Sequence, residues 1–281
     1  MPIYPKISVV TPSYNRKTYL EKTILSVLEQ NYPNLEYIVM DGGSTDGSVE
    51  VIKKYADRLA YWVSEPDKGQ SDALNKGFQK ATGDILAELD TDDLYLPGTL
   101  HTIAEYFAKH PDVEFVYGDL VVIDEEGRQI LTKKTIPYDY KSQLYGGSVV
   151  PQPSSFWRGS VFEKAGRFDV DLHYNMDVEF FTRCGAKGVK FGHLPRPLAC
   201  FRVHTTSKTI NLDKVAAANK ALMETYVGRI FKNEKMNDGA YKFLRWFYRA
   251  KIFIIRVFTR GDIIPYKHTF LVQQVSKKTK E

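Results

Sequence analysis

The sequence lacks the features of an exported or membrane-spanning chain. No apolar run is long and uncharged enough to cross a bilayer. No secretory signal pattern is present at the start, where Met-Pro-Ile-Tyr-Pro-Lys leads directly into a strand-like segment. Cysteines are also scarce. The two that are present, Cys184 and Cys200, have no metal-ligand spacing, so we expect reduced, partly buried thiols rather than a disulfide or a nucleophile. These absences predict a cytoplasmic protein.

Acidic residues are scarce towards the C-terminal end, which makes the charge uneven. The formal net charge is only +5 over 281 residues. Between residues 242 and 280, however, ten lysines and arginines accompany a single acidic residue, Asp262. Such an asymmetry predicts an anionic partner for the tail, either nucleic acid or a membrane surface.

The hydrophobic content of 43% and the order of segment types predict one large α/β domain with an appendage. No internal repeat or low-complexity tract is evident. In the first half, apolar periodicity predicts strands alternating with helices at 6–11, 18–30, 35–40, 48–55, 60–64, 70–81, 84–89 and 100–109. In the second half it predicts strands at 115–119 and 120–132 with a turn at 125–127, a loop entering a strand at 149–158 and a returning strand at 189–203. It also predicts helices at 159–165 and 177–185. The first half is typical of a mostly parallel sheet covered by helices.

Three of the predicted strands end in polar segments, at 11–15, 41–43 and 90–93. Ligands of open α/β sheets bind beyond the carboxyl ends of the strands. In the third segment, Asp90, Asp92 and Asp93 repel one another unless they are solvated, share protons or are bridged by a metal. Such hard oxygen ligands suit Mg²⁺ or Mn²⁺, and a metal held this way would suit a diphosphate. The alternative is an acidic turn with a helix N-cap.

A series of short motifs follows one order along the chain. They are Val-Val-Thr-Pro-Ser-Tyr-Asn at 9–15, Val-Met-Asp-Gly-Gly-Ser-Thr-Asp-Gly at 39–47, Glu-Pro-Asp-Lys-Gly at 65–69, Ala-Leu-Asn-Lys-Gly at 73–77, Ala-Thr-Gly-Asp at 81–84, Asp-Thr-Asp-Asp at 90–93, Gly-Arg-Phe-Asp at 166–169 and Phe-Arg-Val-His at 201–204. Each motif alone is weak, but together the chain from residue 7 to about residue 207 resembles the family 2 glycosyltransferases of GT-A fold. The resemblance implies a Rossmann-like, mostly parallel sheet flanked by helices. It also implies transfer of a sugar from a nucleotide-sugar to an acceptor hydroxyl, with inversion at the anomeric carbon.

The resemblance further implies a division of the chain. Residues 1–210 would form the catalytic domain, with a nucleotide-binding half at 1–119 and an acceptor-binding half at 120–210. Residues 211–281 would form a helical, basic and amphipathic extension.

The nucleotide site is expected at the ends of the first two strands. Asp41 lies beside two glycines that allow a ligand to approach the backbone, and it could accept a hydrogen bond from a nucleobase imide N–H. The resemblance assigns it that role, with Thr11, Pro12 and Tyr14 walling the base. The alternatives are a turn or capping role for Asp41 and a core position for Tyr14.

The resemblance gives the acidic segment the role of the family's metal motif. Asp92 would ligate Mn²⁺ or Mg²⁺ directly, and Asp90 would contact the ribose or reach the metal through water. The ion would neutralise the leaving diphosphate. Asp93 would either support the metal site or cap the following turn. His204 would reach the metal or the diphosphate and Arg202 would bind phosphate oxygens, with a structural role as the alternative for the histidine.

Inversion needs a general base for the acceptor hydroxyl, and Asp177 is the candidate. In the family an Asp preceded by Glu commonly opens a helix here. Met176 replaces that Glu in this chain and leaves Asp177 in register. Glu179 is the second candidate and would otherwise contact the acceptor, and a helix cap is the alternative role for Asp177.

A polar and aromatic segment before this helix is expected to line the acceptor cleft. It contains Gln152, Ser154, Ser155 and Trp157. Trp157 would offer a stacking face to a sugar ring. The alternative is that Trp157 only packs within a strand.

A helix over 242–260 would carry basic residues on one narrow stripe and apolar residues on the wide remainder. The stripe consists of Lys242, Arg245, Arg249, Arg256 and Arg260. Such a helix suits an anionic membrane interface, in which Lys251 would snorkel. The alternative is docking on the catalytic body or on a second subunit of a homo-oligomer. Nucleic acid is disfavoured, because a broad apolar face would have no use there.

Together these features predict a metal-dependent, inverting glycosyltransferase on the inner face of the cell membrane that uses a UDP-, dTDP- or GDP-sugar. Its acceptor would be a lipid-linked or growing glycan of a bacterial-type surface. One rival is a nucleotidyltransferase, which would prefer a Gly-rich, basic phosphate loop after the first strand, and the segment Thr-Pro-Ser-Tyr-Asn-Arg at 11–16 is not such a loop. The other rival is a non-catalytic protein that binds sugar-nucleotides or glycans.

Overall fold

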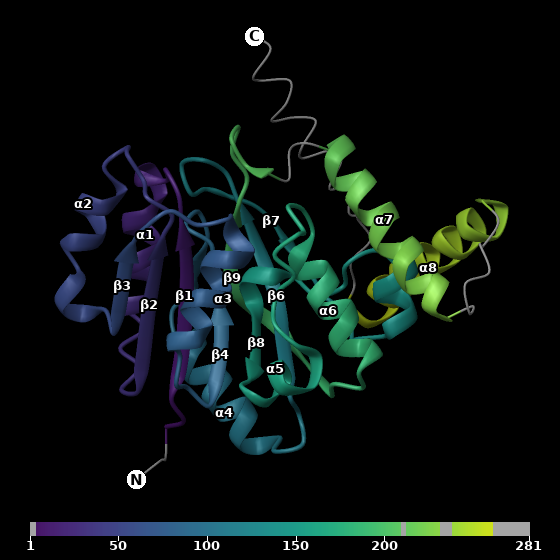
Figure 1. Ribbon diagram of the computed structural model, residues 1–281. Helices are drawn as coiled ribbons and strands as arrows, with labels where there is room; N and C mark the ends of the chain where they lie inside the picture. Colours follow the sequence, from purple (N-terminus) through teal and green to yellow (C-terminus); the bar gives the residue numbers. More distant parts are fainter. Residues whose placement is uncertain (1–3, 209–211, 231–237, 261–281) are drawn as a thin grey trace.

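The computed structural model describes residues 4–208, 212–230 and 238–260. They form a nine-stranded sheet with helices on both faces, and two further helices lie at one side of it (Figure 1). Parallel pairing dominates the half of the sheet built first, and this confirms the predicted α/β fold class.

The first half of the chain builds the parallel part of the sheet, in the order β3-β2-β1-β4. Its strands are β1 (Ile7–Ser13), β2 (Leu35–Asp41), β3 (Tyr61–Ser64) and β4 (Ile85–Glu88). Its helices are α1 (Lys17–Leu28), α2 (Ser48–Lys53) and α3 (Gln70–Lys80), with the short turn η1 (Ala56–Arg58) after α2. All strands and α-helices of this half begin and end within two residues of the predicted bounds.

The second half adds mixed pairings. Its strands are β5 (Leu94–Tyr95), β6 (Phe115–Ile123), β7 (Gln129–Lys133), β8 (Ser155–Arg158) and β9 (Phe191–Arg202). β8 runs antiparallel to both β4 and β6, whereas β9 runs parallel to β6. The turn predicted at 125–127 is confirmed, but the predicted break between residues 119 and 120 is wrong. Residues 115–123 form one strand, buried along its whole length between its neighbours, and the chain turns only after residue 123.

The helices of the second half cover the sheet and one of its sides. They are α4 (Thr99–Lys109), α5 (Ser160–Ala165), α6 (Met176–Ala186), α7 (Leu212–Ile230) and α8 (Asp238–Arg260), with the short turns η2 (Ser142–Gly146) and η3 (Gln152–Ser154). α7 lies within the extension at 211–281 that was predicted to be helical, although no separate bounds were predicted for it. α8 corresponds to the predicted helix at 242–260 and begins four residues earlier.

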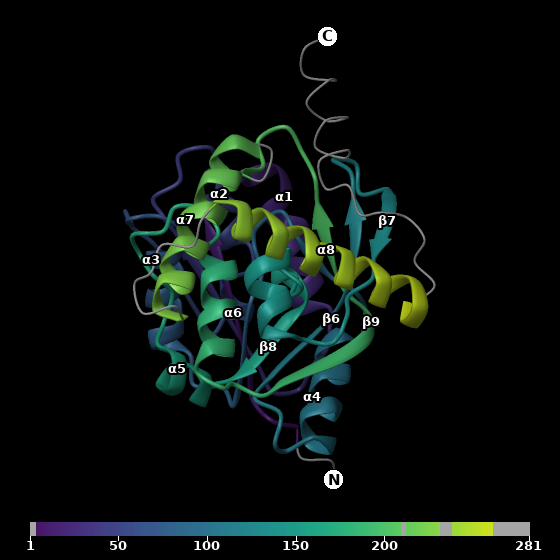
Figure 2. The ribbon, with the colours of Figure 1, turned by 90° about the vertical axis from the view of Figure 1, so that its right-hand side faces the viewer.

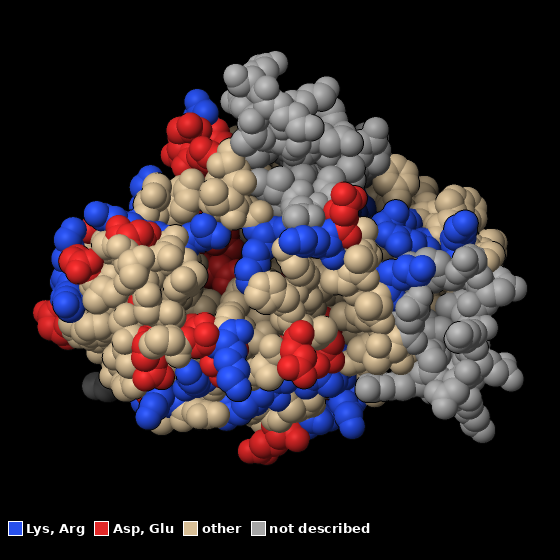
Figure 3. Space-filling view, turned by 45° about the horizontal axis from the view of Figure 1, so that its top comes forward, with Lys and Arg blue, Asp and Glu red and all other residues tan. Residues whose placement is uncertain are grey.

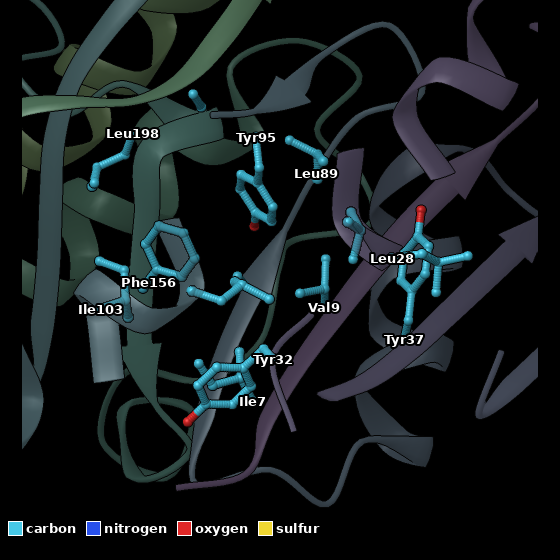
Figure 4. Close-up of a cluster of buried hydrophobic side chains, with 14 of the residues drawn as sticks. Ile7, Val9, Leu28, Tyr32, Tyr37, Leu89, Tyr95, Ile103, Phe156 and Leu198 are labelled. Carbon is cyan, nitrogen blue, oxygen red and sulfur yellow. The ribbon is translucent and has the colours of Figure 1, made fainter. Parts of the chain in front are cut away.

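The hydrophobic core has a layer on each face of the sheet. One cluster joins the sheet to α1, α2 and α4, and the other joins the opposite face to α3, α5 and α6. Figure 4 shows part of the first cluster, in which Val9 of β1, Leu28 of α1 and Ile103 of α4 are buried. Because both faces are covered, the ends of the central strands are held in fixed positions.

Helix α8 docks on the body of the fold through one side. Leu244 and Tyr248 pack with Leu144 and Tyr145 of η2, and Ile252 enters the core beside α6. In Figure 2 the helix lies across this side of the molecule. Six of its large apolar side chains remain exposed, namely Phe243, Trp246, Phe247, Phe253, Ile254 and Phe258, and of these Trp246 and Phe253 also line a cavity. The structure therefore shows the expected alternative of docking on the body, together with an uncovered apolar face.

Three sequence expectations concern features away from the site. Cys184 and Cys200 are buried free thiols, as expected. Within the described residues, no helix combines the length and the apolarity that a bilayer crossing requires. Four residues of the basic tail, Lys267, Lys277, Lys278 and Lys280, lie outside the described residues.

Candidate active site

The ends of three neighbouring parallel strands meet at one edge of the sheet. In the register of β1, β2 and β3, Ser13 lies opposite Asp41 and Asp41 lies opposite Ser64. β4 pairs with the other side of β1, ends at Glu88 and delivers residues 89–93 to the same edge. The polar segments predicted from the sequence are thus brought together beyond the carboxyl ends of the strands.

Asp90, Asp92 and Asp93 form a tight acidic cluster. One carboxylate oxygen from each residue lies within 4.8 Å of the others. Burial, and then repulsion from Asp92, raises the pKa of Asp90 to about 7. Burial and the charges of Asp92 and Asp90 likewise raise the pKa of Asp93 well above its ordinary value. A divalent cation would offset this crowded negative charge, and carboxylate oxygens are the ligands that Mn²⁺ and Mg²⁺ prefer, so the three residues fit such an ion.

A fourth carboxyl group, that of Glu88, lies at the end of β4. Both of its oxygens are buried, and neither has a hydrogen-bond partner among the described residues. Burial and the neighbouring charge of Asp90 raise the pKa of Glu88 well above its ordinary value. A raised pKa favours the neutral acid form of this carboxyl group over its charged form.

Two residues that the sequence did not single out hold Asp90. Gln70 Nε2, at the start of α3, donates to both carboxylate oxygens of Asp90 at 2.7 and 2.9 Å. Lys208 Nζ donates in turn to Gln70 Oε1 at 3.0 Å. A signal existed for Gln70, which directly follows the motif at 65–69. Nothing marked Lys208, which comes from a segment 138 residues further along the chain.

His204 reaches the acidic cluster, in the place that the resemblance implied. Its Nε2 lies 2.8 Å from Asp92 Oδ2, and its Nδ1 lies 3.0 Å from Thr206 Oγ1. The side chain is buried, and its ring packs against that of Tyr19 with 4.8 Å between centroids. Because both ring nitrogens are engaged, His204 orients the Asp92 carboxylate. Its role as a metal ligand stays a prediction.

Arg202, for which phosphate binding stays a prediction, is engaged by neighbouring loops in this structure. It is 1% exposed, its Nε donates to the carbonyl oxygen of Asp92, and its Nη1 donates to those of Asp124 and Glu125, each at 3.0 Å. Its backbone N–H donates to Asp93 Oδ1 at 2.9 Å. A buried guanidinium needs such partners, and here the carbonyl oxygens provide them. Arg202 therefore anchors the loop that carries Asp92 and Asp93.

Asp41 acts as a turn residue in this structure. Its Oδ2 accepts hydrogen bonds from the backbone N–H groups of Gly43 and Ser44 at 3.1 and 2.8 Å and from Ser64 Oγ at 2.7 Å. Its Oδ1 accepts one from Ser44 Oγ at 2.6 Å, and the residue is 2% exposed. This geometry matches the capping alternative, because a buried carboxylate with four hydrogen bonds has little left to offer a nucleobase.

The wall predicted for the base is divided between core and surface. Thr11 and Pro12 are buried within β1, whereas Tyr14, which follows β1, is 62% exposed. A Cβ atom placed on Gly42 would lie 2.6 Å from Asp67 Oδ2 and 3.3 Å from Tyr14 Cδ2. The side chains of Tyr14 and Asp67 therefore converge over the bare backbone of Gly42. Asp67 was quoted in a motif but had no assigned role.

Asp177 lies in the first turn of α6 and lines a cavity together with Asp90. Burial raises the pKa of Asp177, while the positive charges of Lys133 and Lys208 act against this rise. Met176, which replaces the glutamate common in the family, is buried and leaves Asp177 as the acidic residue that lines this end of the cavity. A carboxylate of raised pKa that faces a cavity suits a general base.

Two residues predicted for the acceptor cleft do not face it. Trp157 is fully buried and stacks on Phe115 with 5.6 Å between ring centroids, so strand packing is its role here. Glu179 forms an ion pair with Arg183 at 2.8 Å and accepts a hydrogen bond from Tyr226 OH at 2.6 Å. Its carboxylate thus joins α6 to α7.

The rest of the predicted acceptor segment is also divided. Gln152 lines the cavity, and its Nε2 lies 3.4 Å from the carbonyl oxygen of Glu88. Ser154 and Ser155 are fully buried, and their hydroxyls donate to backbone carbonyl oxygens at 3.0 and 2.7 Å. Of this segment, Gln152 keeps the predicted position.

The cavity has a volume of about 1070 Å³ and extends from Asp90 to α8. Its acidic lining residues are Asp90 and Asp177, and its basic lining residues are Lys133, Lys208, Lys242, Arg245, Arg249 and Arg256. Figure 3 shows acidic side chains at the floor of a recess on this face, with basic side chains around it. The basic stripe predicted to face a membrane therefore lines the cavity instead, at least from residue 242 to residue 256.

Comparison with known proteins adds independent information. Residues 8–166 match the family model described as Glycosyl transferase family 2. An uncharacterized glycosyltransferase of Haemophilus influenzae is 32% identical over 256 residues, which cover 88% of this chain and 97% of that protein.

Two solved structures resemble the whole described fold. S. aureus TarS 1–349 in complex with UDP-GlcNAc matches with a TM-score of 0.64 at 16% identity, over 91% of this chain and 73% of that chain. A second, longer TarS structure also matches, and the match covers 80% of this chain but only 43% of the TarS chain. The mannosyltransferase PcManGT from Pyrobaculum calidifontis, in complex with GDP-Man and Mn²⁺, matches with a TM-score of 0.62 at 19% identity, over 99% of this chain and 81% of that chain. At these identities the likeness shows the fold.

Proposed function

This chain belongs to glycosyl transferase family 2, and on that premise we propose that it transfers a sugar from a nucleotide-diphosphate sugar to an acceptor hydroxyl with inversion. The observation that carries the proposal is that Asp90 of the acidic cluster and Asp177 line the same cavity. Carboxylates that hold a cation suit the leaving diphosphate, whereas a separate basic carboxylate suits the attacking hydroxyl. Membership of the family favours this function over a nucleotidyltransferase or a non-catalytic binding protein.

Asp177 takes the proton of the acceptor hydroxyl as that oxygen attacks the anomeric carbon. The new C–O bond forms on the face opposite the bond to the diphosphate, which breaks, so the configuration inverts and the nucleoside diphosphate leaves. Burial raises the pKa of Asp177 and so makes its carboxylate a stronger base than an exposed aspartate.

Asp92 and Asp90 are the residues that would hold the divalent cation, Mn²⁺ or Mg²⁺, and His204 contacts Asp92. When bound, the cation supplies Lewis-acid stabilisation of the negative charge on the departing diphosphate. The tight acidic cluster and the Mn²⁺ in the PcManGT structure support this role. His204 and Arg202 contribute by fixing the Asp92 side chain and its loop.

The nucleotide lies across the ends of β1 and β2, with its base against the ring of Tyr14. The exposure of this ring at the end of β1 supports this position. Because the solved relatives hold UDP-GlcNAc and GDP-Man, UDP- and GDP-sugars are the first donors to test, followed by dTDP-sugars.

We further propose that the protein works on the inner face of the cell membrane and extends a lipid-linked or growing surface glycan. The exposed apolar side of α8 supports this position, because an apolar helix face of this size suits a membrane interface. The cavity opens beside α8, so a membrane-bound acceptor would reach Asp177 from that side.

The test is a panel of nucleotide-sugars, each with Mn²⁺, with Mg²⁺ or with EDTA, scored by melting temperature and by donor hydrolysis. We expect at least one donor to raise the melting temperature only when metal is present, because a ligand that binds the folded state alone stabilises it. If no donor does so, the proposed function is wrong.

A further inference from the structure

The wall of the cavity that α8 forms is strongly basic, and the proposed chemistry gives this wall no task. Six basic residues line the cavity against the two acidic ones, Asp90 and Asp177. Four of the six, Lys242, Arg245, Arg249 and Arg256, come from α8 and are called the α8 basic row below. The diphosphate of the donor is already matched by the acidic cluster and its cation.

The α8 basic row lines the same cavity as the proposed general base. Its members are separated by three, four and seven residues, so they share one face of the helix over roughly 21 Å at 1.5 Å per residue. Lys133 of β7 and Asp177 line this cavity as well. The row therefore borders the space in which the acceptor hydroxyl would reach Asp177.

The row makes one wall of the cavity electropositive. Burial and the like charge of Arg256 lower the pKa of Lys133 to about 8, so a cation on a neighbouring strand already responds to the row. Leu244, Tyr248 and Ile252 dock the helix, and Trp246 and Phe253 line the cavity beside the four basic residues. An electropositive cavity wall attracts an anionic ligand.

We propose that the acceptor carries a phosphate group, which the α8 basic row binds while the acceptor hydroxyl lies at Asp177. This inference rests on the proposed function and names the chemistry of its acceptor. Arginine side chains pair with phosphate through two parallel N–H···O bonds. We therefore assign the phosphate to Arg245 and Arg249, the two arginines in the middle of the row. The phosphate could belong to a lipid carrier or to a soluble phosphate-bearing glycan, and both offer the same group.

Binding to the full chain tests the proposal, with calorimetry in EDTA so that no metal-held diphosphate site competes. The probes are decyl phosphate, decyl glucoside with the same alkyl chain but no charge, and glycerol 3-phosphate with no alkyl chain. We expect wild-type protein to bind decyl phosphate at least about tenfold more tightly than decyl glucoside, since charged hydrogen bonds discriminate by this much or more. Comparable binding of glycerol 3-phosphate identifies the phosphate alone as the ligand. Much weaker binding identifies a lipid-borne phosphate.

The matched variants are Arg245→Gln with Arg249→Gln, and, as a control for charge loss alone, Lys22→Gln with Lys53→Gln on exposed positions of α1 and α2. The double variant of Arg245 and Arg249 should lose the preference for decyl phosphate. The double variant of Lys22 and Lys53 should keep it. Arg245→Lys with Arg249→Lys should retain part of it, which separates lost charge from a helix that no longer docks. Equal binding of the two decyl probes by wild type, or an unchanged preference after Arg245→Gln with Arg249→Gln, would overturn the proposal.

A separate readout keeps this proposal distinct from the proposed function. Stabilisation by a nucleotide-sugar with Mn²⁺ should persist in the Arg245→Gln, Arg249→Gln variant and vanish in Asp92→Asn. If that stabilisation is missing from wild type while the phosphate preference is present, the donor chemistry is wrong and the anion site stands. If the arginine variant loses the nucleotide response, the α8 basic row serves the donor and the acceptor proposal fails.

Discussion

The donor side and the acceptor side of the cavity are built in different ways. On the donor side, carboxylates sit at the ends of parallel strands and are fixed by hydrogen bonds, as Asp41 is by its own loop and Asp93 by the backbone of Arg202. On the acceptor side, cations sit on α8, a helix that docks through a few residues and exposes its other face. One side is acidic and part of the sheet, whereas the other is basic and added to it.

The family model covers residues 8–166, which include the acidic cluster and end before α6, α7 and α8. The similarity to the Haemophilus influenzae relative extends beyond that limit, over 88% of this chain. Under the proposed function, the leaving-group chemistry would belong to the part that the family model describes, and the acceptor would be selected by the helices that follow it. Asp177, at the start of α6, stands where the two sides meet.

Removing the general base should produce the largest effect, because the acceptor hydroxyl then has no group to take its proton. Asp177→Asn keeps the shape but cannot take the proton, so we expect transfer to fall by about 10³-fold, within the usual range for a general base. Donor binding should be unchanged, since Asp177 is not among the predicted nucleotide contacts. Steady-state transfer kinetics and calorimetric donor binding check the two parts. Asp171→Asn, at an exposed position in the preceding loop, is the control, and undiminished turnover in Asp177→Asn would exclude this residue as the base.

Removing the metal ligand should break the donor side alone. In Asp92→Asn we expect transfer to fall by on the order of 10²-fold and metal-dependent stabilisation by the nucleotide-sugar to disappear, because charge stabilisation of the diphosphate is lost. EDTA should have the same effect on wild type. Melting curves with and without Mn²⁺ measure it, and Asp112→Asn on the exposed surface is the matched control. A variant that keeps its full metal response would show that Asp92 does not hold the ion.

The donor side was largely predictable from the sequence, because local patterns determine it. Strands and helices up to residue 88 follow from apolar periodicity, and the strand-end rule places the segments at 11–15, 41–43 and 90–93 together. A motif predicted that His204 would reach the metal or the diphosphate, and in the structure its ring contacts Asp92 of the acidic cluster. Individual roles were less predictable. Arg202 and Asp41 carry charge in motifs typical of ligand contacts, yet backbone groups of the loops occupy both side chains.

The acceptor side was not predictable to the same degree, because long-range docking determines it. The amphipathic pattern of residues 242–260 predicted the helix but not which of its faces would be covered. Lys133 and Lys208 join the cavity from distant segments, and no local pattern marks either. Trp157 shows the opposite error, since an aromatic residue in a polar segment can equally enter the core, as it does here.

A stability experiment sharpens the view that the parallel sheet is the rigid foundation of the site. Glu36 on β2 is buried and accepts hydrogen bonds from Ser8 Oγ, Thr82 Oγ1 and the Thr82 backbone N–H, and it pairs with Lys6 at 2.8 Å. Burial acts to raise the pKa of Glu36, but these partners outweigh it and lower the pKa to about 2, from an ordinary 4.5. We expect Glu36→Gln to reduce the free energy of unfolding by about 2 kcal/mol at pH 7.

The stability lost in Glu36→Gln should depend on pH, and this dependence tests whether the charge of Glu36 is the cause. Because the folded-state pKa of Glu36 is lowered, its contribution is fully present above the unfolded value and is lost as the pH falls from about 4.5 towards 2. The difference between wild type and Glu36→Gln in urea unfolding should therefore shrink over that window. The control is Glu29→Gln, at the exposed C-cap position of α1, and it should show no such trend. A difference that stays constant from pH 7 to low pH would show that the charge of Glu36 is not what stabilises the sheet.

The smallest expected effect concerns the outer face of α8. Phe258 is 84% exposed, so Phe258→Ser should leave the fold and the cavity intact. If the apolar face rests on a membrane, the variant should bind vesicles of phosphatidylglycerol and phosphatidylcholine roughly threefold to tenfold more weakly, because one partly inserted aromatic ring contributes about 1 kcal/mol. Vesicle co-sedimentation measures this, with Val170→Ser, an exposed apolar position away from α8, as control. Equal vesicle binding by wild type and Phe258→Ser, together with a wild-type dimer that dissociates in the variant, would assign the face to a second copy of the chain. The acceptor side would then be completed by protein rather than by lipid, and the phosphate bound by the α8 basic row would have to come from a soluble glycan.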